Sequence, residues 1–265
     1  IIEEMREELL KLGGKVYSGQ KIPIIIQLIG NKGDEAQPRS MVSKIEKVEG
    51  AYQVKLYIHL ANTIDNELLQ YHLMELLLYE RGLNSDHEVV GGERVLVKPW
   101  LIIGLLESIK IKAGKEDKDL YQADIDYFDI LSVEEVFDAS EQQQRDMVGL
   151  QPTAFRGISG AMVNSLLRQP NGAVNMEGYI AEFASFKGEP DNLLRKHFPG
   201  MNKSKNSLQK WVNLEMLELG TADVTQVLSI IETDDRLESY LQFSYKNEEG
   251  EVSGLNIHAY GEILS

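Results

Sequence analysis

The chain has 265 residues, of which 43% are hydrophobic, so it is long enough to form one large folded domain or two smaller ones. Its 42 acidic and 27 basic side chains give a formal charge of -15, which disfavours nucleic acid and anionic membrane surfaces as partners. Cysteine is absent, which excludes disulfides, thiolate metal sites and a cysteine nucleophile. No run approaches the roughly 18 apolar residues that a membrane span requires, so we expect none in this chain.

The first sixty residues predict a helix followed by a small sheet. Apolar residues in Ile1–Leu12 are spaced for one helix face, and Gly13 begins a pair of glycines that ends the helix. The β-branched run Pro23–Ile29 and the alternating segment Tyr52–Leu60 are typical of strands, and Met41–Glu49 is a candidate third strand.

A long apolar helix follows, with Asn62 or Thr63 as its expected N-cap and Gly82 near its end. Because the segment is apolar almost all round, we expect a central helix packed on several sides. Two ionisable residues, His72 and Glu75, lie three positions apart and therefore on one face. Since a buried carboxylate usually has a partner, a structural hydrogen-bonded pair is the favoured interpretation, and a two-ligand metal site is the other.

After a polar loop over 84–94 and a short strand Val95–Val97, Pro99 is expected to open the next helix with Trp100 just inside it. The rest of the chain is predicted to be mainly helical. The expected elements are a polar connection at Glu141–Leu150, helices at Ser159–Leu167 (with Gly157–Gly160 as its small-residue start), Val174–Phe186, Asp191–Phe198, Leu208–Leu219 and Asp223–Ile231, and a hairpin of Leu241–Tyr245 with Val252–Tyr260.

These elements predict an α+β protein with a small N-terminal β-sheet, a mainly helical region and a C-terminal β-hairpin. We expect three regions within one compact unit: residues 1–62 (helix and sheet), 63–220 (helical) and 221–265 (helix and hairpin).

Two segments carry a resemblance to a known family. The central helix ends in Leu77–Gly82 (Leu-Leu-Tyr-Glu-Arg-Gly), and the next helix begins with Pro99–Leu106 (Pro-Trp-Leu-Ile-Ile-Gly-Leu-Leu). Together with the order of the later helices, they make the chain similar, over about Tyr52 to Met201, to gluzincin metallopeptidases of the peptidase-MA type. The resemblance implies a small sheet beside a helical active-site region.

The zinc signature of that family is degenerate here. In the alignment that the resemblance implies, Tyr71 stands for the first ligand His, His72 for the catalytic Glu, Glu75 for the second His and Ile103 for the third ligand. Only Glu75 among the three ligand positions is a ligand type, whereas catalytic zinc normally has three protein ligands. We therefore expect no metal, no cofactor and no catalytic residues, and we lean against an enzyme.

The leading functional hypothesis is a non-catalytic pseudopeptidase that binds a polypeptide or other protein, or acts as an assembly module. An extended peptide is expected to add to the sheet edge. Its expected cleft is formed by Tyr71, His72, Glu75, Trp100 and Ile103.

Two alternatives stay open: a hydrolase that uses His72 and Glu75 as an acid/base pair, and a structural domain of a secreted or envelope protein. The chain begins at Ile1 rather than Met, so any signal peptide or anchor would lie upstream of it. The location therefore rests on the resemblance, which leads us to expect an extracytoplasmic (periplasmic or secreted) protein.

Overall fold

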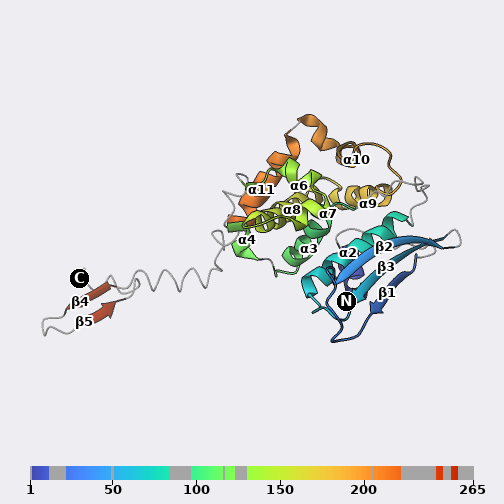
Figure 1. The fold of residues 1–265 in the computed structure, drawn as a ribbon. Helices are drawn as coiled ribbons and strands as arrows, with labels where there is room; N and C mark the ends of the chain where they lie inside the picture. The colour runs from blue at the N-terminus through green and yellow to red at the C-terminus, as the bar shows by residue number, and fades with distance from the viewer. Residues whose placement is uncertain are drawn as a thin grey trace. The chain divides into compact units, whose positions relative to one another are not determined.

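The structure is a computed structural model that describes residues 2–11, 22–48, 51–83, 97–115, 117–122, 130–204, 206–221, 243–246 and 252–255. The chain divides into two compact units, Ile1–Gly220 and Thr221–Ser265. The first contains a small sheet and a set of helices, which confirms the predicted α+β class (Figure 1). The expected loop and strand over 84–96, the helix over 223–231 and the hairpin turn over 247–251 lie outside the described residues.

The sheet of the first unit consists of β1 (Ile24–Ile29), β2 (Met41–Val48) and β3 (Ala51–His59). The three strands predicted from the sequence are thus confirmed. Their order is β1-β3-β2, with β1 parallel and β2 antiparallel to the central strand β3. Val54, Leu56 and Ile58 of β3 are buried, because the period of two in this strand places all three on one face.

The buried face of the sheet packs against α2 (Asn66–Leu83), the central helix predicted from the sequence. Its N-cap prediction was wrong. Asp65 Oδ1 accepts hydrogen bonds from the backbone N–H groups of Glu67 and Leu68, at 2.8 and 3.3 Å. Asn62 instead exchanges two hydrogen bonds with the backbone of Gln37, so its side chain holds the preceding loop rather than the helix. The N-terminal helix α1 (Ile2–Lys11) also contacts α2.

The helical part is built around the close pair α3 (Pro99–Lys112) and α8 (Gln151–Leu167). Pro99 begins α3, as predicted. A Cβ atom on Gly104 would lie 2.4 Å from the Ser159 carbonyl oxygen, so only glycine permits this approach of the two backbones. The expected start of α8 near Gly157–Gly160 was wrong, because these residues lie inside the helix. Gly160 packs closely against Glu107 of α3, where a Cβ atom would lie 3.1 Å from Glu107 Cβ.

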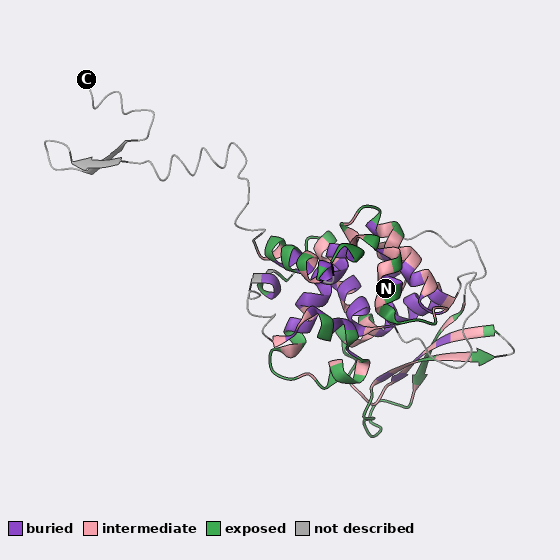
Figure 2. Cartoon of the chain, turned by 90° about the horizontal axis from the view of Figure 1, so that it is seen from above, coloured by how far each residue is buried: buried purple, intermediate pink, exposed green. Residues whose placement is uncertain are grey.

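Further helices complete this part, and Figure 2 shows that the buried residues are concentrated in the helical part. The predicted polar connection after Ser140 contains a helix, because the side chains of Ser140 and Gln143 form a reciprocal capping box. The other helices are α4 (Lys118–Gln122), α6 (Val133–Asp138), α7 (Glu141–Arg145), α9 (Gly172–Glu182), α10 (Pro190–His197), the 3₁₀ helix η2 (Pro199–Lys203) and α11 (Ser207–Thr221).

The second unit contains the antiparallel strands β4 (Phe243–Lys246) and β5 (Val252–Leu255). This pairing confirms the predicted C-terminal hairpin.

Candidate functional site

A cleft of about 440 Å³ opens between the start of β2 and helices α2, α3, α7 and α8. Both polar and apolar side chains line it, and these belong to segments far apart in the sequence. The lining residues are Pro38, Arg39, Ser40, Met41, Asp65, Glu67, Leu68, Gln70, Tyr71, His72, Ile103, Leu106, Glu107, Lys110, Glu141, Gln144, Arg145, Pro152 and Arg156.

Three of the five residues expected to form a cleft line this one: Tyr71 and His72 from α2, and Ile103 from α3. Burial, followed by the negative charges of Glu75 and Glu141, raises the pKa of Tyr71 far above its usual value. The phenol therefore keeps its proton and remains a hydrogen-bond donor at the wall of the cleft.

His72 is held through one ring nitrogen. Its Nδ1 lies 3.1 Å from Glu75 Oε2 and 2.8 Å from the hydroxyl oxygen of Ser43 on β2. No described residue hydrogen-bonds to Nε2, and the side chain is 7% exposed at the cleft wall. Because Ser43 and Glu75 meet the same nitrogen, the three residues do not form a nucleophile, base and orienting-acid relay, which requires the two ring nitrogens to have different partners.

Glu75 lies behind His72 and does not line the cleft. It is buried, and His72 is the hydrogen-bond partner that a carboxylate in an apolar helix requires.

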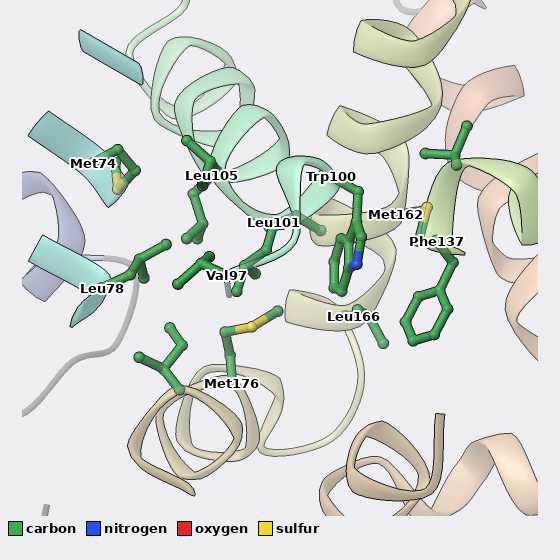
Figure 3. Packing of buried hydrophobic residues seen from close by; sticks show 14 of the residues in the cluster. Met74, Leu78, Val97, Trp100, Leu101, Leu105, Phe137, Met162, Leu166 and Met176 are labelled. Carbon is green, nitrogen blue, oxygen red and sulfur yellow. The ribbon is translucent and has the colours of Figure 1, made fainter. Parts of the chain in front are cut away.

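Trp100 also does not line the cleft: its side chain is fully buried in the core. It packs against Phe137 and Tyr179, with ring centroids 5.6 and 6.4 Å away. Figure 3 shows it on the Phe137 and Met162 side of α3. The helical period alone does not separate these residues, because Trp100, Ile103 and Glu107 are three and seven positions apart and share one side of α3. Trp100 lies in the first turn, where Phe137 and Tyr179 cover it, whereas Ile103 and Glu107 lie farther along the helix at the cleft.

A cluster of charged residues that the sequence analysis missed forms another wall of the cleft. Glu107 of α3 has a side chain only 3% exposed, and it accepts hydrogen bonds from Arg156 Nε at 2.7 Å and Lys110 Nζ at 2.8 Å. The signal in the sequence was Glu107 itself, an acid at the end of a long apolar run. Arg156 follows 49 positions later, and nothing in the local pattern connects it to Glu107.

β2 begins at the cleft, and its first residue, Met41, is part of the lining. No other described strand pairs with the outer edge of β2, because β2 is the last strand in the order β1-β3-β2. His59 N donates to the Ser40 carbonyl, so Ser40 and every second residue after it bond toward β3. The backbone N–H and C=O groups that point toward the free edge therefore belong to Met41, Ser43, Ile45 and Lys47.

The positions that the resemblance implies for zinc do not fit the metal. Ile103 has no ligand atom, Glu75 is engaged by His72, and Tyr71 keeps its proton. Within the described ranges, no three His, Asp or Glu side chains converge as a metal site.

The segment Leu77–Gly82, which carried part of the resemblance, serves to hold α2 in place. Glu80 pairs with Arg6 of α1 at 2.9 Å, and Arg81 pairs with Glu177 of α9 at 3.3 Å. These contacts explain the polar residues of this segment without a role in the cleft.

Among the described helices, none is both long and apolar enough to cross a membrane. Comparison with protein-family models, with curated proteins and with solved structures finds no match for this chain.

Proposed function

We propose that the first unit binds an extended polypeptide along the free edge of β2 and in the adjacent cleft, and that it does not cleave the polypeptide. In this proposal the chain resembles a gluzincin metallopeptidase that has lost its metal, and we propose an extracytoplasmic location by the same resemblance. One observation carries the proposal: β2, whose outer edge pairs with no described strand, begins at a cleft of about 440 Å³.

Strand addition supplies affinity through backbone hydrogen bonds, while pockets beside the strand select side chains. The free edge of β2 offers outward-pointing backbone groups, and Tyr71, Leu68 and Ile103 provide apolar surface in the cleft beside it. Ser43 connects the strand edge to the wall of the cleft, because its backbone points to the free edge and its hydroxyl contacts His72.

Ser43→Pro tests this proposal, because proline removes the outward N–H of residue 43 without removing a hydrogen bond to β3. Proline is tolerated on edge strands for this reason. The probe is a pool of randomised octapeptides with an N-terminal fluorescein, and the measurement is fluorescence anisotropy. We expect the wild type to bind the pool and Ser43→Pro to lose binding, while Ser43→Ala, which keeps the N–H, retains it.

A peptide pool with N-methyl groups on every backbone nitrogen gives a second test that leaves the protein unchanged. It is expected to bind much more weakly, because strand addition needs those N–H groups. Absence of binding by the wild type, or equal binding of methylated and unmethylated pools, would reject strand addition.

The second candidate is a hydrolase in which His72 is a general base oriented by Glu75. It is favoured by the bond from Glu75 to Nδ1, which leaves Nε2 as the nitrogen without a described partner at the cleft. Mass spectrometry of the peptide pool after incubation distinguishes the two candidates. Cleavage that disappears in His72→Ala supports the hydrolase, and intact peptides support the binding function.

A further inference from the structure

We infer that the cleft receives the C-terminal end of the bound polypeptide and recognises its free carboxylate. This inference rests on the proposed function, since it concerns the same strand edge and the same cleft.

The direction of β2 gives the first argument. The cleft is lined by residues at the start of this strand, from Pro38 to Met41. A peptide that pairs antiparallel to β2 runs in the opposite direction, so its C-terminal end lies beside Met41 and enters the cleft. Antiparallel pairs outnumber parallel ones about two- to three-fold, and β2 itself is already antiparallel to β3.

The hydrogen-bond donors of the cleft give the second argument. Arg39 is exposed at the cleft and makes no hydrogen bond or ion pair with the described part of the chain. Lys110 donates one hydrogen bond, to Glu107, although an ammonium group has three donors. The Tyr71 hydroxyl also has no described partner. These groups are therefore available to a carboxylate, with which arginine can form two parallel, charge-assisted hydrogen bonds.

The carboxylates of the cleft are mostly occupied, which disfavours the opposite orientation. Four cationic and four acidic side chains line the cleft, so these equal counts do not decide whether its ligand is positively or negatively charged. Glu107 is bound by Arg156 and Lys110, Glu141 is paired with Arg145, and Asp65 accepts hydrogen bonds from the N-terminus of α2. A peptide amino group would find only Glu67 without a described hydrogen bond, and this residue is exposed.

The test compares two pools of randomised octapeptides with an N-terminal fluorescein, one ending in a free carboxylate and one in an amide. Fluorescence anisotropy with the complete chain gives the apparent Kd of each pool. Because a hydrogen bond to a charged group contributes about 1.5–3 kcal/mol, we expect the carboxylate pool to bind at least about tenfold more tightly.

Arg39→Gln is expected to remove most of this preference, while Lys115→Gln, which removes an exposed cation outside the cleft, is expected to keep it. Equal affinity for the two pools would overturn the inference and leave the proposed function standing, provided that Ser43→Pro still abolishes binding. Failure of the wild type to bind either pool would overturn both. If Arg39→Gln and Lys115→Gln reduced the preference for the carboxylate pool equally, the preference would come from the overall charge of the protein. That result would reject recognition of the carboxylate in the cleft.

Discussion

The Ser43 hydroxyl lies 2.8 Å from His72 Nδ1, so one contact joins the edge strand β2 to the central helix α2. The same nitrogen lies 3.1 Å from Glu75 Oε2. When Nδ1 carries its hydrogen, the Glu75 carboxylate is the stronger acceptor, and the Ser43 hydroxyl contributes a weaker share. The contact of His72 with Glu75 is therefore expected to contribute more to stability than its contact with Ser43.

This difference predicts unequal effects of two substitutions. Ser43→Ala is expected to lower the free energy of unfolding by about 1 kcal/mol, the net contribution of one ordinary hydrogen bond. His72→Ala is expected to lower it by about 3 kcal/mol, because it leaves the buried Glu75 carboxylate without its partner. Urea denaturation at neutral pH measures both, and equal losses would contradict this account of the Nδ1 contacts.

Gly104→Ala is expected to destabilise the first unit by about 1–3 kcal/mol, the usual range for overpacking. The added methyl group would lie 2.4 Å from both the Ser159 carbonyl oxygen and Val163 Cγ2, so α3 and α8 must move apart. Thermal denaturation measures the loss. Lys115→Ala, at an exposed position just after the same helix, should change the stability by less than about 0.5 kcal/mol.

Two ion pairs in the cleft provide a matched comparison of burial. Glu107 has a side chain 3% exposed in its pair with Arg156, whereas Glu141 is 38% exposed in its pair with Arg145. Glu107→Gln is expected to lower the free energy of unfolding by about 2 kcal/mol. The substitution removes the negative charge that stabilises the partly buried side chains of Arg156 and Lys110.

Glu141→Gln is expected to cost less than about 1 kcal/mol, as is usual for exposed pairs. The two variants are compared by urea denaturation at one salt concentration. If Glu141→Gln were as destabilising as Glu107→Gln, burial would not determine the strength of these pairs.

Glu215 of α11 predicts a pH dependence of stability. Burial raises its pKa to about 7, and the positive charge of Arg168 offsets part of this increase. Glu215 is 4% exposed, and its Oε1 has no hydrogen-bond partner among the described residues. Because folding raises the pKa of this acid above its usual value of 4.5, its ionisation destabilises the fold.

The contribution of Glu215 is therefore most favourable at low pH and falls as the pH rises from about 4.5 to about 7, above which it stays constant. Glu215→Gln is expected to remove this decline and to stabilise the protein at pH 8 by on the order of 2 kcal/mol. The check is the difference in unfolding free energy between wild type and variant from pH 5 to 8. Glu35→Gln, in an exposed loop, is the control and should show no such difference.

Local sequence pattern predicted most of the secondary structure. The β-branched run in β1, the alternation in β3 and Pro99 at the start of α3 depend on steric and hydrogen-bonding properties of neighbouring residues, so they can be read from short segments. The α8 boundary was wrong for the opposite reason. A Cβ atom on Gly160 would lie 2.5 Å from the Tyr121 hydroxyl of α4 and 3.1 Å from Glu107 Cβ of α3, and these contacts are not encoded within the segment.

The site shows the same division. The sequence placed His72 and Glu75 on one face of a helix, because a spacing of three residues fixes their direction. Only the tertiary structure brought Ser43 to His72 and Arg156 to Glu107, since these pairs are 29 and 49 positions apart.

The sequence by itself therefore determined which helices and strands form and which side chains share a face, since both follow from local geometry. The packing of helices against one another decided that Trp100 belongs to the core and that Glu107 belongs to the cleft. Position along a helix gives a direction but not the neighbour in that direction, and the neighbour determines whether a side chain meets solvent, a ligand or the core.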